Sequence, residues 1–110
     1  MKKGPSAPDS DPARCPVTFC LSVIGGKWKP VILFCIANRV NRFGVMQRSV
    51  AGITKQMLTK QLRELEGDGL IARTGYAEVP PRVDYALTDM GRTVLPIIKL
   101  MRDWGQANMK

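Results

Sequence analysis

The segment from Thr54 to Asp68 constrains the fold of this chain more than any other. At about 100° per residue, Leu58, Leu62 and Leu65 fall on one side of a helix. Thr54 stands where a hydroxyl can accept hydrogen bonds from the first free backbone N–H groups, so the pattern predicts a capped helix. One face of this helix is expected in a core, and the opposite face carries polar and basic side chains: Gln56, Thr59, Lys60 and Arg63.

The segments on either side predict a helix-turn-helix followed by a wing. Arg42 to Val50 reads as a helix with inward-facing Phe43, Met46 and Val50, and "GIT" supplies the turn. After the second helix, "LIARTGY" and "RVDYALT" both alternate and are joined by "AEVPP", which predicts a projecting hairpin. Helix, turn, helix and basic hairpin is the layout of a winged helix that reads DNA.

Three further helices complete a fold that we expect to be mainly α with a small β-hairpin wing. Pro16 suits the first position of a short helix and puts Cys15 at its N-cap. The segment from Trp28 to Ala37 is apolar nearly all round and is expected at the centre of the domain. Thr88 is expected to cap the last helix, with Asp89 in its first turn.

Length and composition predict one domain without a membrane segment. A chain of 110 residues, 45% of them hydrophobic, supports a single core. Residues 1–14 contain three prolines and no apolar periodicity, so we expect a flexible tail followed by a domain over residues 15–107. No run approaches the ~18 apolar residues of a membrane span and no signal peptide is recognised, which predicts a cytoplasmic protein.

The positive charge is concentrated where the helix pair is predicted. The chain carries a net charge of +8, and between Arg39 and Glu64 six basic residues face one acid. Such a patch favours a polyanion, because each neutralised phosphate releases counterions. An ordinary solvated surface is the alternative interpretation.

These observations predict a double-stranded DNA partner and assign the contacts. Phosphates are expected to bind Arg42, Arg48, Lys55, Lys60 and the wing residues Arg73 and Arg82, and free N–H groups beside the Thr54 cap. Bases are expected to be read by Gln56, Thr59, Lys60 and Arg63. A winged helix that binds proteins and not DNA is an alternative, although its exposed face would usually be acidic or apolar.

Metal binding and catalysis find little support in the sequence. Cys15, Cys20 and Cys35 fit neither a disulfide framework nor a zinc pattern, and the chain has no histidine. No acid or lysine sits in a nucleophile or glycine-rich motif, so a small thiol enzyme lacks a base. We therefore expect no metal, no cofactor and no enzymatic activity.

The last helix carries an apolar stripe at the end of the chain, where few intramolecular surfaces are left to cover it. We expect a homodimer contact, shared with the helix after Pro16, and hence an inverted-repeat operator. The alternative is that the stripe folds back on its own domain, and both can hold in part. The expected contact residues are Val17, Leu21, Val94, Ile97, Ile98, Met101 and Trp104.

Cys15 is a candidate redox sensor. A thiol at an N-cap beside Arg14 feels the helix dipole and a positive neighbour, and both favour the reactive thiolate. The alternative is a cysteine that serves only as a mediocre cap. Cys20 and Cys35 lie on apolar faces and are expected to be inert core residues.

Several long motifs resemble one family of bacterial regulators. "CPVTFCLSVIGGKWKPVIL", "GITKQMLTKQLRELEGDGLI" and "EVPPRVDYALTDMGR", with "DWG" near the end, are similar to HxlR-type winged-helix transcription regulators, a branch related to MarR-like repressors. The resemblance runs from about Cys15 to Gly105. It departs after Arg42-Phe43, where the family's acidic residue is missing.

The resemblance implies a homodimer with one winged helix in each subunit, and residues 55–68 in the major groove. It also implies control of a neighbouring gene, as a repressor or an activator, and in several members a response to oxidants or electrophiles through the cysteine that matches Cys15. The effector, the operator and the regulated gene do not follow from the sequence.

Overall fold

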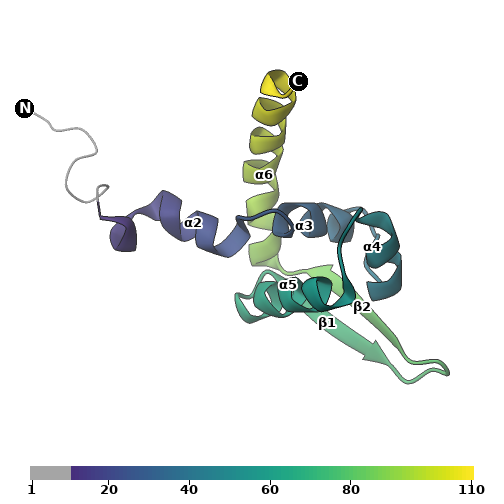
Figure 1. The fold of residues 1–110 in the computed structure, drawn as a ribbon. Helices are drawn as coiled ribbons and strands as arrows, with labels where there is room; N and C mark the ends of the chain where they lie inside the picture. The colour runs from purple at the N-terminus through teal and green to yellow at the C-terminus, as the bar shows by residue number, and fades with distance from the viewer. Residues whose placement is uncertain (1–10) are drawn as a thin grey trace, which may run out of the picture.

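The computed structural model describes residues 11–110. They form a short 3₁₀ helix, five α-helices and one two-stranded hairpin. Figure 1 shows a central body from which α2, the hairpin and the C-terminal part of α6 extend in different directions. The elements are η1 (Pro12–Arg14), α2 (Pro16–Ile24), α3 (Lys29–Ala37), α4 (Phe43–Ser49), α5 (Lys55–Gly67), β1 (Ile71–Tyr76), β2 (Arg82–Leu87) and α6 (Asp89–Asn108).

The order helix, helix, hairpin and final helix confirms the predicted winged helix-turn-helix. Every helix predicted from periodicity is present, with ends shifted by one or two residues. Of the predicted N-terminal tail, residues 1–10 lie outside the described residues, and Pro12–Arg14 form the 3₁₀ turn, which Asp11 caps through Ala13 N–H.

The core lies between α3, α4, α5 and the base of the hairpin. Ile32 and Leu33 of α3, Met46 of α4 and Leu58 of α5 are fully buried. Val50 and Ile53 close the core beneath the turn between α4 and α5. Burying one large apolar side chain stabilises the folded state by about 1.5–3 kcal/mol, so this cluster is the main source of stability.

Threonine side chains cap the N-termini of α5 and α6. The hydroxyl of Thr54 accepts a hydrogen bond from Met57 N–H at 3.1 Å, and that of Thr88 accepts one from Gly91 N–H at 3.0 Å. Thr88 also donates to the carbonyl of Gly69 at 2.6 Å, so the start of α6 is tied to the end of α5. Both predicted caps are confirmed.

The hairpin is antiparallel, with Ile71 paired to Leu87 at its base and Tyr76 to Arg82 at its far end. The predicted inside-outside alternation is present only near the base, because Leu70, Ile71 and Tyr85 are buried while residues 72–81 are exposed. β1 leaves the body after Ile71, and β2 runs back toward it and is buried at Tyr85, so the far end of the hairpin has no core to cover. We call this hairpin, residues 71–87, the wing.

Candidate nucleic-acid interface

The candidate interface is the outward side of α5. Leu58, Leu62 and Leu65 anchor this helix in the core, as predicted. In the turn before it, Gly52 has φ +83°, a conformation that few other residues adopt without strain. The opposite side of the helix presents the four predicted probing residues together with Lys55, all exposed except the half-buried Thr59: Lys55, Gln56, Thr59, Lys60 and Arg63.

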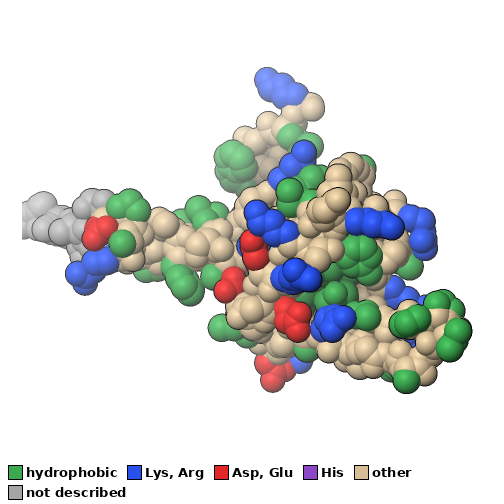
Figure 2. Space-filling model, turned by 60° about the horizontal axis from the view of Figure 1, so that its bottom comes forward, with side chains coloured by type: hydrophobic (Ala, Val, Ile, Leu, Met, Phe, Trp, Pro, Cys, Tyr) green, Lys and Arg blue, Asp and Glu red, His purple; other side chains and the backbone are tan. Residues whose placement is uncertain are grey.

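None of these five side chains forms a hydrogen bond or an ion pair with any part of the chain that the structure describes. Their polar groups are therefore available to an outside partner. They line one shallow depression together with Glu64. Figure 2 shows Lys and Arg side chains spread over the face that carries α5 and the wing.

Glu64, one of the two acids of α5, is directed to the body by Lys29. The ammonium Nζ of Lys29 lies 2.7 Å from the Glu64 carboxylate, and only 10% of the Lys29 side chain is exposed against 43% of the Glu64 side chain. The hydrogen bond and the charge of Lys29 lower the pKa of Glu64. The pair joins the first turn of α3 to α5.

Sequence reasoning missed this pair, because it treated residues 28–37 as apolar nearly all round. The signal available in the sequence was Lys29 within that apolar segment, together with the acid Glu64 beside the outward face of α5. A buried ammonium group requires a partner, and Glu64 is the acid that the fold brings within reach.

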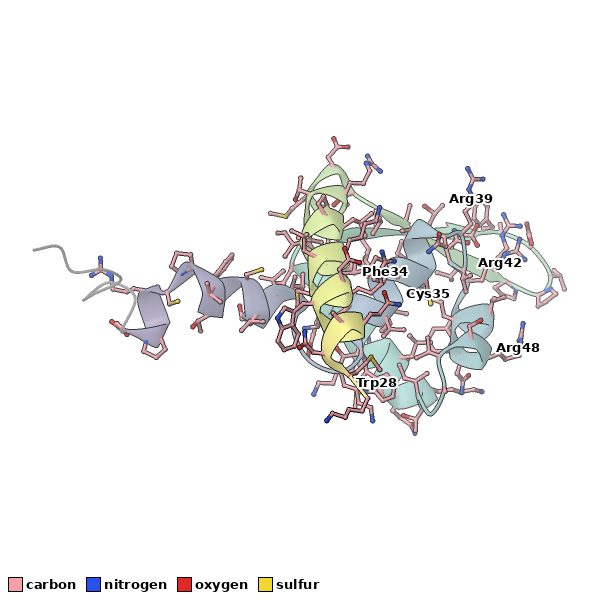
Figure 3. The ribbon with its side chains drawn as sticks, turned by 90° about the horizontal axis from the view of Figure 1, so that it is seen from above. Trp28, Phe34, Cys35, Arg39, Arg42 and Arg48 are labelled. Atoms are coloured by element: carbon pink, nitrogen blue, oxygen red, sulfur yellow. The ribbon has the colours of Figure 1, made fainter. Side chains whose placement is uncertain are left out.

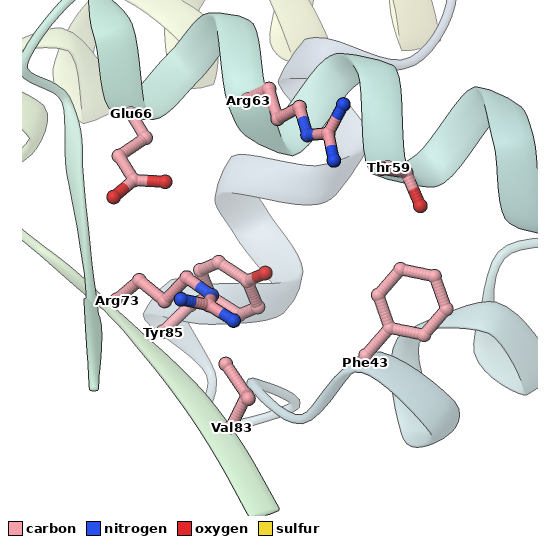
Figure 4. A pocket seen from close by; sticks show the side chains of 7 residues that line it. All are labelled: Phe43, Thr59, Arg63, Glu66, Arg73, Val83 and Tyr85. Carbon is pink, nitrogen blue, oxygen red and sulfur yellow. The ribbon is translucent and has the colours of Figure 1, made fainter. Parts of the chain in front are cut away.

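A hollow of about 420 Å³ lies between α5, the start of α4 and the wing. Arg63 from α5 and Arg73 from β1 both face it, as Figure 4 shows, and neither guanidinium group has an ion-pair partner among the described residues. Glu66 also lines it and is likewise unpaired there. The floor is formed by Phe43, Val83 and Tyr85. Two unpaired guanidinium groups facing one hollow suit an anionic group such as a phosphate.

The remaining predicted basic residues lie along α4. Arg42 is the N-cap residue and Arg48 stands in the last turn, and both side chains are exposed. In Figure 3 Arg39, Arg42 and Arg48 lie on the side of the molecule away from α2. Arg42 and Arg48 line a second hollow, about 540 Å³, which the residues of the wing close on the other side.

Arg82 differs from the other predicted contact residues, because its guanidinium group is engaged within the wing. It lies 3.4 Å from Asp84, 3.4 Å from Glu78 and 4.0 Å above the centre of the Tyr76 ring. Only 28% of its side chain is exposed. The sequence assigned Arg82 to phosphate contact, whereas the structure turns it toward its own strand neighbours.

The comparisons with known proteins agree with this geometry. The family model described as HxlR-like helix-turn-helix matches residues 23–110. The chain belongs to the HxlR-like helix-turn-helix family. It is 49% identical over 94 residues to the HTH-type transcriptional regulator YybR of Bacillus subtilis (strain 168), covering 86% of this chain and 75% of YybR.

Solved structures extend the likeness to the whole HxlR-like fold. The redox regulator HypR in its oxidised form is 47% identical, covers 87% of this chain and 99% of its own, and superposes with a TM-score of 0.80. A chain from Porphyromonas gingivalis W83 assigned to the MarR family is 40% identical, covers 86% of this chain and 93% of its own, and gives a TM-score of 0.76. These relatives are transcriptional regulators and not enzymes.

The apolar residues predicted for a dimer contact divide into two groups in this HxlR-like chain. Ile98, only 2% exposed, belongs to the core of the single chain, and the half-buried Val94 packs against that core. The assignment of Ile98 to a dimer contact is corrected here, because α6 lays this side chain against its own domain. The other predicted residues stay exposed: Val17, Leu21, Ile97, Met101 and Trp104.

The three cysteines of this HxlR-like chain occupy different surroundings. Cys15 is the N-cap residue of α2, as predicted, although its side chain makes no capping hydrogen bond. Cys20 is half-buried on α2, and burial raises the pKa of the Cys35 thiol on α3. Both pack against the core but neither is fully buried, and their low reactivity stays a prediction.

Neither a metal-ion cluster nor a single membrane-spanning helix is found among the described residues of this HxlR-like chain. Residues 11–110 contain no group of three or more Cys, Asp or Glu side chains placed to hold a metal ion. Within the same range, no single helix has the length and apolarity needed to cross a membrane, and the pair α2 and α3, which reaches both together, is bent by 66°.

Proposed function

We propose that this chain is a sequence-specific, double-stranded-DNA-binding regulator that works as a homodimer, with α5 in the major groove and the wing on the flanking backbone. The observation that carries the proposal is the unpaired polar and basic face of α5, held rigidly by Leu58, Leu62 and Leu65 on its other side. A helix of this kind fits the major groove and presents donors to base edges.

The contacts divide by chemistry. Gln56 offers an amide that can bind adenine at two points, and Arg63 offers a guanidinium that can bind guanine in the same way. Lys60 and Thr59 lie on the same face and add contacts to either bases or phosphates. Phosphate binding is assigned to the free N–H groups beside Thr54 and to these basic residues: Arg42, Arg48, Lys55, Lys60 and Arg73.

A winged helix that binds another protein is the second candidate. Its contact surface would be expected to have an apolar centre. The outward face of α5 has none, since its exposed residues are basic or carry an amide. The composition of this face therefore favours DNA.

The proposal is tested by selecting duplexes from a randomised library with the unaltered protein and measuring affinity for a selected and a scrambled duplex. The selected duplex should bind at least about 10³-fold more tightly at physiological salt, and both affinities should fall as salt rises. Gln56→Ala should cost about 1–3 kcal/mol on the selected duplex and little on the scrambled one.

Lys55→Ala is the matched control, because its loss should weaken binding to both duplexes alike and reduce the salt slope by about one unit. Enrichment of no sequence at all would remove sequence-specific DNA binding as the function. Equal losses on both duplexes for Gln56→Ala would move that residue to the phosphate class.

Dimer formation is proposed from the surfaces of α2 and α6. Phe19 and Trp104 are 70% and 71% exposed, and Leu100 and Met90 are similarly uncovered. A hollow of about 350 Å³, lined mainly by apolar side chains, opens between α2 and the start of α6. Exposed apolar area of this extent on two extending helices is typical of an interface between subunits. A second copy of this chain, related by a two-fold axis, would cover both helices.

The proposal also includes a redox response through Cys15. Its support is the position of the thiol at the start of α2, where the helix dipole favours a thiolate, and the likeness to HypR, a redox regulator solved in oxidised and reduced forms. Oxidation or alkylation at this position would change the packing of α2 and, through the dimer contact, the spacing of the two recognition helices.

Diamide treatment tests this response. The affinity of the unaltered protein for a selected duplex should change after treatment, while that of Cys15→Ser should not. Cys15 should also be alkylated faster than Cys20 or Cys35 at neutral pH. Unchanged affinity in the unaltered protein, or the same change in Cys15→Ser, would remove Cys15 as a sensor.

A further inference from the structure

We propose that Asp84 is a positioning residue for DNA binding: it holds the wing at a set angle to the helix pair without touching DNA itself. The inference rests on the proposed function and concerns an acid within an otherwise basic surface. It is carried by a connected set of contacts that links the far end of the wing to the start of α4.

The first contact set is the carboxylate itself. Asp84 Oδ1 lies 3.4 Å from Nε of Arg82, on its own strand, and 3.5 Å from Nε of Arg42, at the start of α4. This oxygen is shielded from solvent and, like Nε of Arg82, makes no hydrogen bond within the described chain. A shielded carboxylate oxygen is held in place by its charge partners, so one atom ties two elements together.

The second contact set extends this tie along the wing. The guanidinium group of Arg82 stacks 4.0 Å above the ring of Tyr76, the residue paired with it across the hairpin. Its other side reaches Glu78, beyond the end of β1, at 3.4 Å. The orientation of Arg82 therefore fixes the end of the wing, and Asp84 fixes the orientation of Arg82.

The backbone continues the connection into the helix pair. Tyr85 N–H donates to the carbonyl of Asn41 at 3.0 Å, and the Asn41 side-chain amide donates to the carbonyl of Tyr85 at 3.0 Å. Arg42 and Asp84 form an isolated antiparallel bridge at the same place. Residues 41–42 are thus joined to β2 by backbone contacts, and the Asp84 side chain adds an ion pair at this junction.

The positioning role and a purely electrostatic role predict effects of opposite sign. An acid between two arginines on a DNA-facing surface repels phosphates, so its neutralisation alone would strengthen binding. If Asp84 sets the angle of the wing, its neutralisation releases the wing and specific binding weakens although the net charge becomes more positive.

Asp84→Asn in the full chain is the test, read by affinity for a selected duplex and by hydroxyl-radical footprinting. We expect affinity for the selected duplex to fall by about tenfold, with protection lost from the backbone at the flanks and retained at the centre. Affinity for a scrambled duplex should not fall. Glu66→Gln is the matched control, since it removes one unpaired acid from the same surface and should raise both affinities slightly.

Two further variants separate positioning from a loss of folding. Tyr76→Leu removes the ring beneath Arg82 at the exposed end of the wing and should give the same loss of flanking protection with little change in the thermal midpoint. Arg82→Gln and Asp84→Asn should not be additive, because both release the same contact.

The result that overturns the proposal is an Asp84→Asn protein that binds the selected duplex as tightly as the unaltered protein, or more tightly, with full flanking protection. Uniform loss of protection at centre and flanks would also overturn it, since that pattern belongs to general unfolding. Failure of the unaltered protein to bind any duplex is a different outcome, which removes the proposed function and this role with it.

Discussion

The ammonium group of Lys29 forms an ion pair with the carboxylate of Glu64 on α5. At 8% exposure, Lys29 is the one charged residue that the described chain buries. A buried ion pair is weak support for stability, but removing one partner leaves the other charge without compensation. The role that we assign to the pair is to fix the position of the recognition helix against α3.

This pair predicts an acid dependence of stability. Because Lys29 lowers the pKa of Glu64 in the folded state, the stabilisation is complete above the ordinary carboxyl pKa of about 4.3 and is lost as pH falls through the lowered value. Thermal midpoints between pH 6 and pH 3 should therefore fall more steeply for the unaltered protein than for Lys29→Met, in which Glu64 has no partner.

A second comparison checks the same pair at neutral pH. Glu64→Ala leaves a buried ammonium group unpaired and should lower the thermal midpoint more than Lys29→Met, which replaces the lysine by an apolar side chain. Parallel acid profiles of the unaltered protein and Lys29→Met would contradict the account of the pair.

At the scale of elements, the start of α6 packs against the loop between α5 and β1 more closely than any side chain would allow. A Cβ atom on Gly91 would lie 2.0 Å from the carbonyl oxygen of Leu70. The same loop is tied to Thr88 through hydrogen bonds to the carbonyls of Gly69 and Leu70. Gly91 is thus required by contact and not by its own backbone conformation.

Gly91→Ala should separate α6 from this loop and lower the free energy of unfolding by about 1–3 kcal/mol or more, the cost of overpacking. Gly67→Ala is the control, since a Cβ there meets nothing within 4 Å, and alanine should stabilise the helix by up to about 1 kcal/mol. Urea unfolding followed by circular dichroism measures both. Equal stability of Gly91→Ala and the unaltered protein would show that the loop moves to accommodate the added methyl group, and would contradict this prediction.

The elements predicted best are those whose signals are local. The 3.6-residue period and Thr54 suffice for α5 and its cap, and Pro16 suffices for the start of α2. The wing departs from the predicted alternation because strand burial depends on what lies above each face. The prediction of Ile98 as a dimer contact is wrong for a similar reason. The burial of Ile98 depends on how α6 crosses the core, which the sequence of α6 alone does not reveal.

In the candidate site, too, residues with local sequence signals were predictable and tertiary contacts were not. The outward face of α5 was predictable residue by residue, because a helix of known phase has only one exposed side. The pair Lys29 and Glu64, and the engagement of Arg82 by Asp84 and Tyr76, join segments that are separate in the sequence or cross a hairpin. Such contacts need the fold before they can be assigned.

At the scale of the whole molecule, α2 and the outer part of α6 extend from the central body (Figure 1), and both carry exposed apolar side chains. Ile97→Asp combined with Trp104→Asp should give folded monomers, because both side chains are exposed in the single chain. Sedimentation should show a dimer for the unaltered protein and a monomer for the variant.

The monomeric variant should also bind a selected duplex at least about 10²-fold more weakly, because two linked recognition helices bind as one unit. Ile98→Asp is not a suitable substitute, since it would place a charge in the core. A stable unaltered monomer that binds DNA tightly would contradict the dimer.

Methylation interference on a selected duplex tests the central claim, that two copies of α5 read the major groove. Methyl groups on guanine N7 block that groove specifically. Two interfering clusters are expected, arranged as an inverted repeat with centres one helical turn of about 34 Å apart or a multiple of it, and Arg63→Ala should lose the interference at the guanine that Arg63 binds in both clusters. Interference confined to one cluster, or absent from the major groove of a duplex that the protein binds, would contradict this claim.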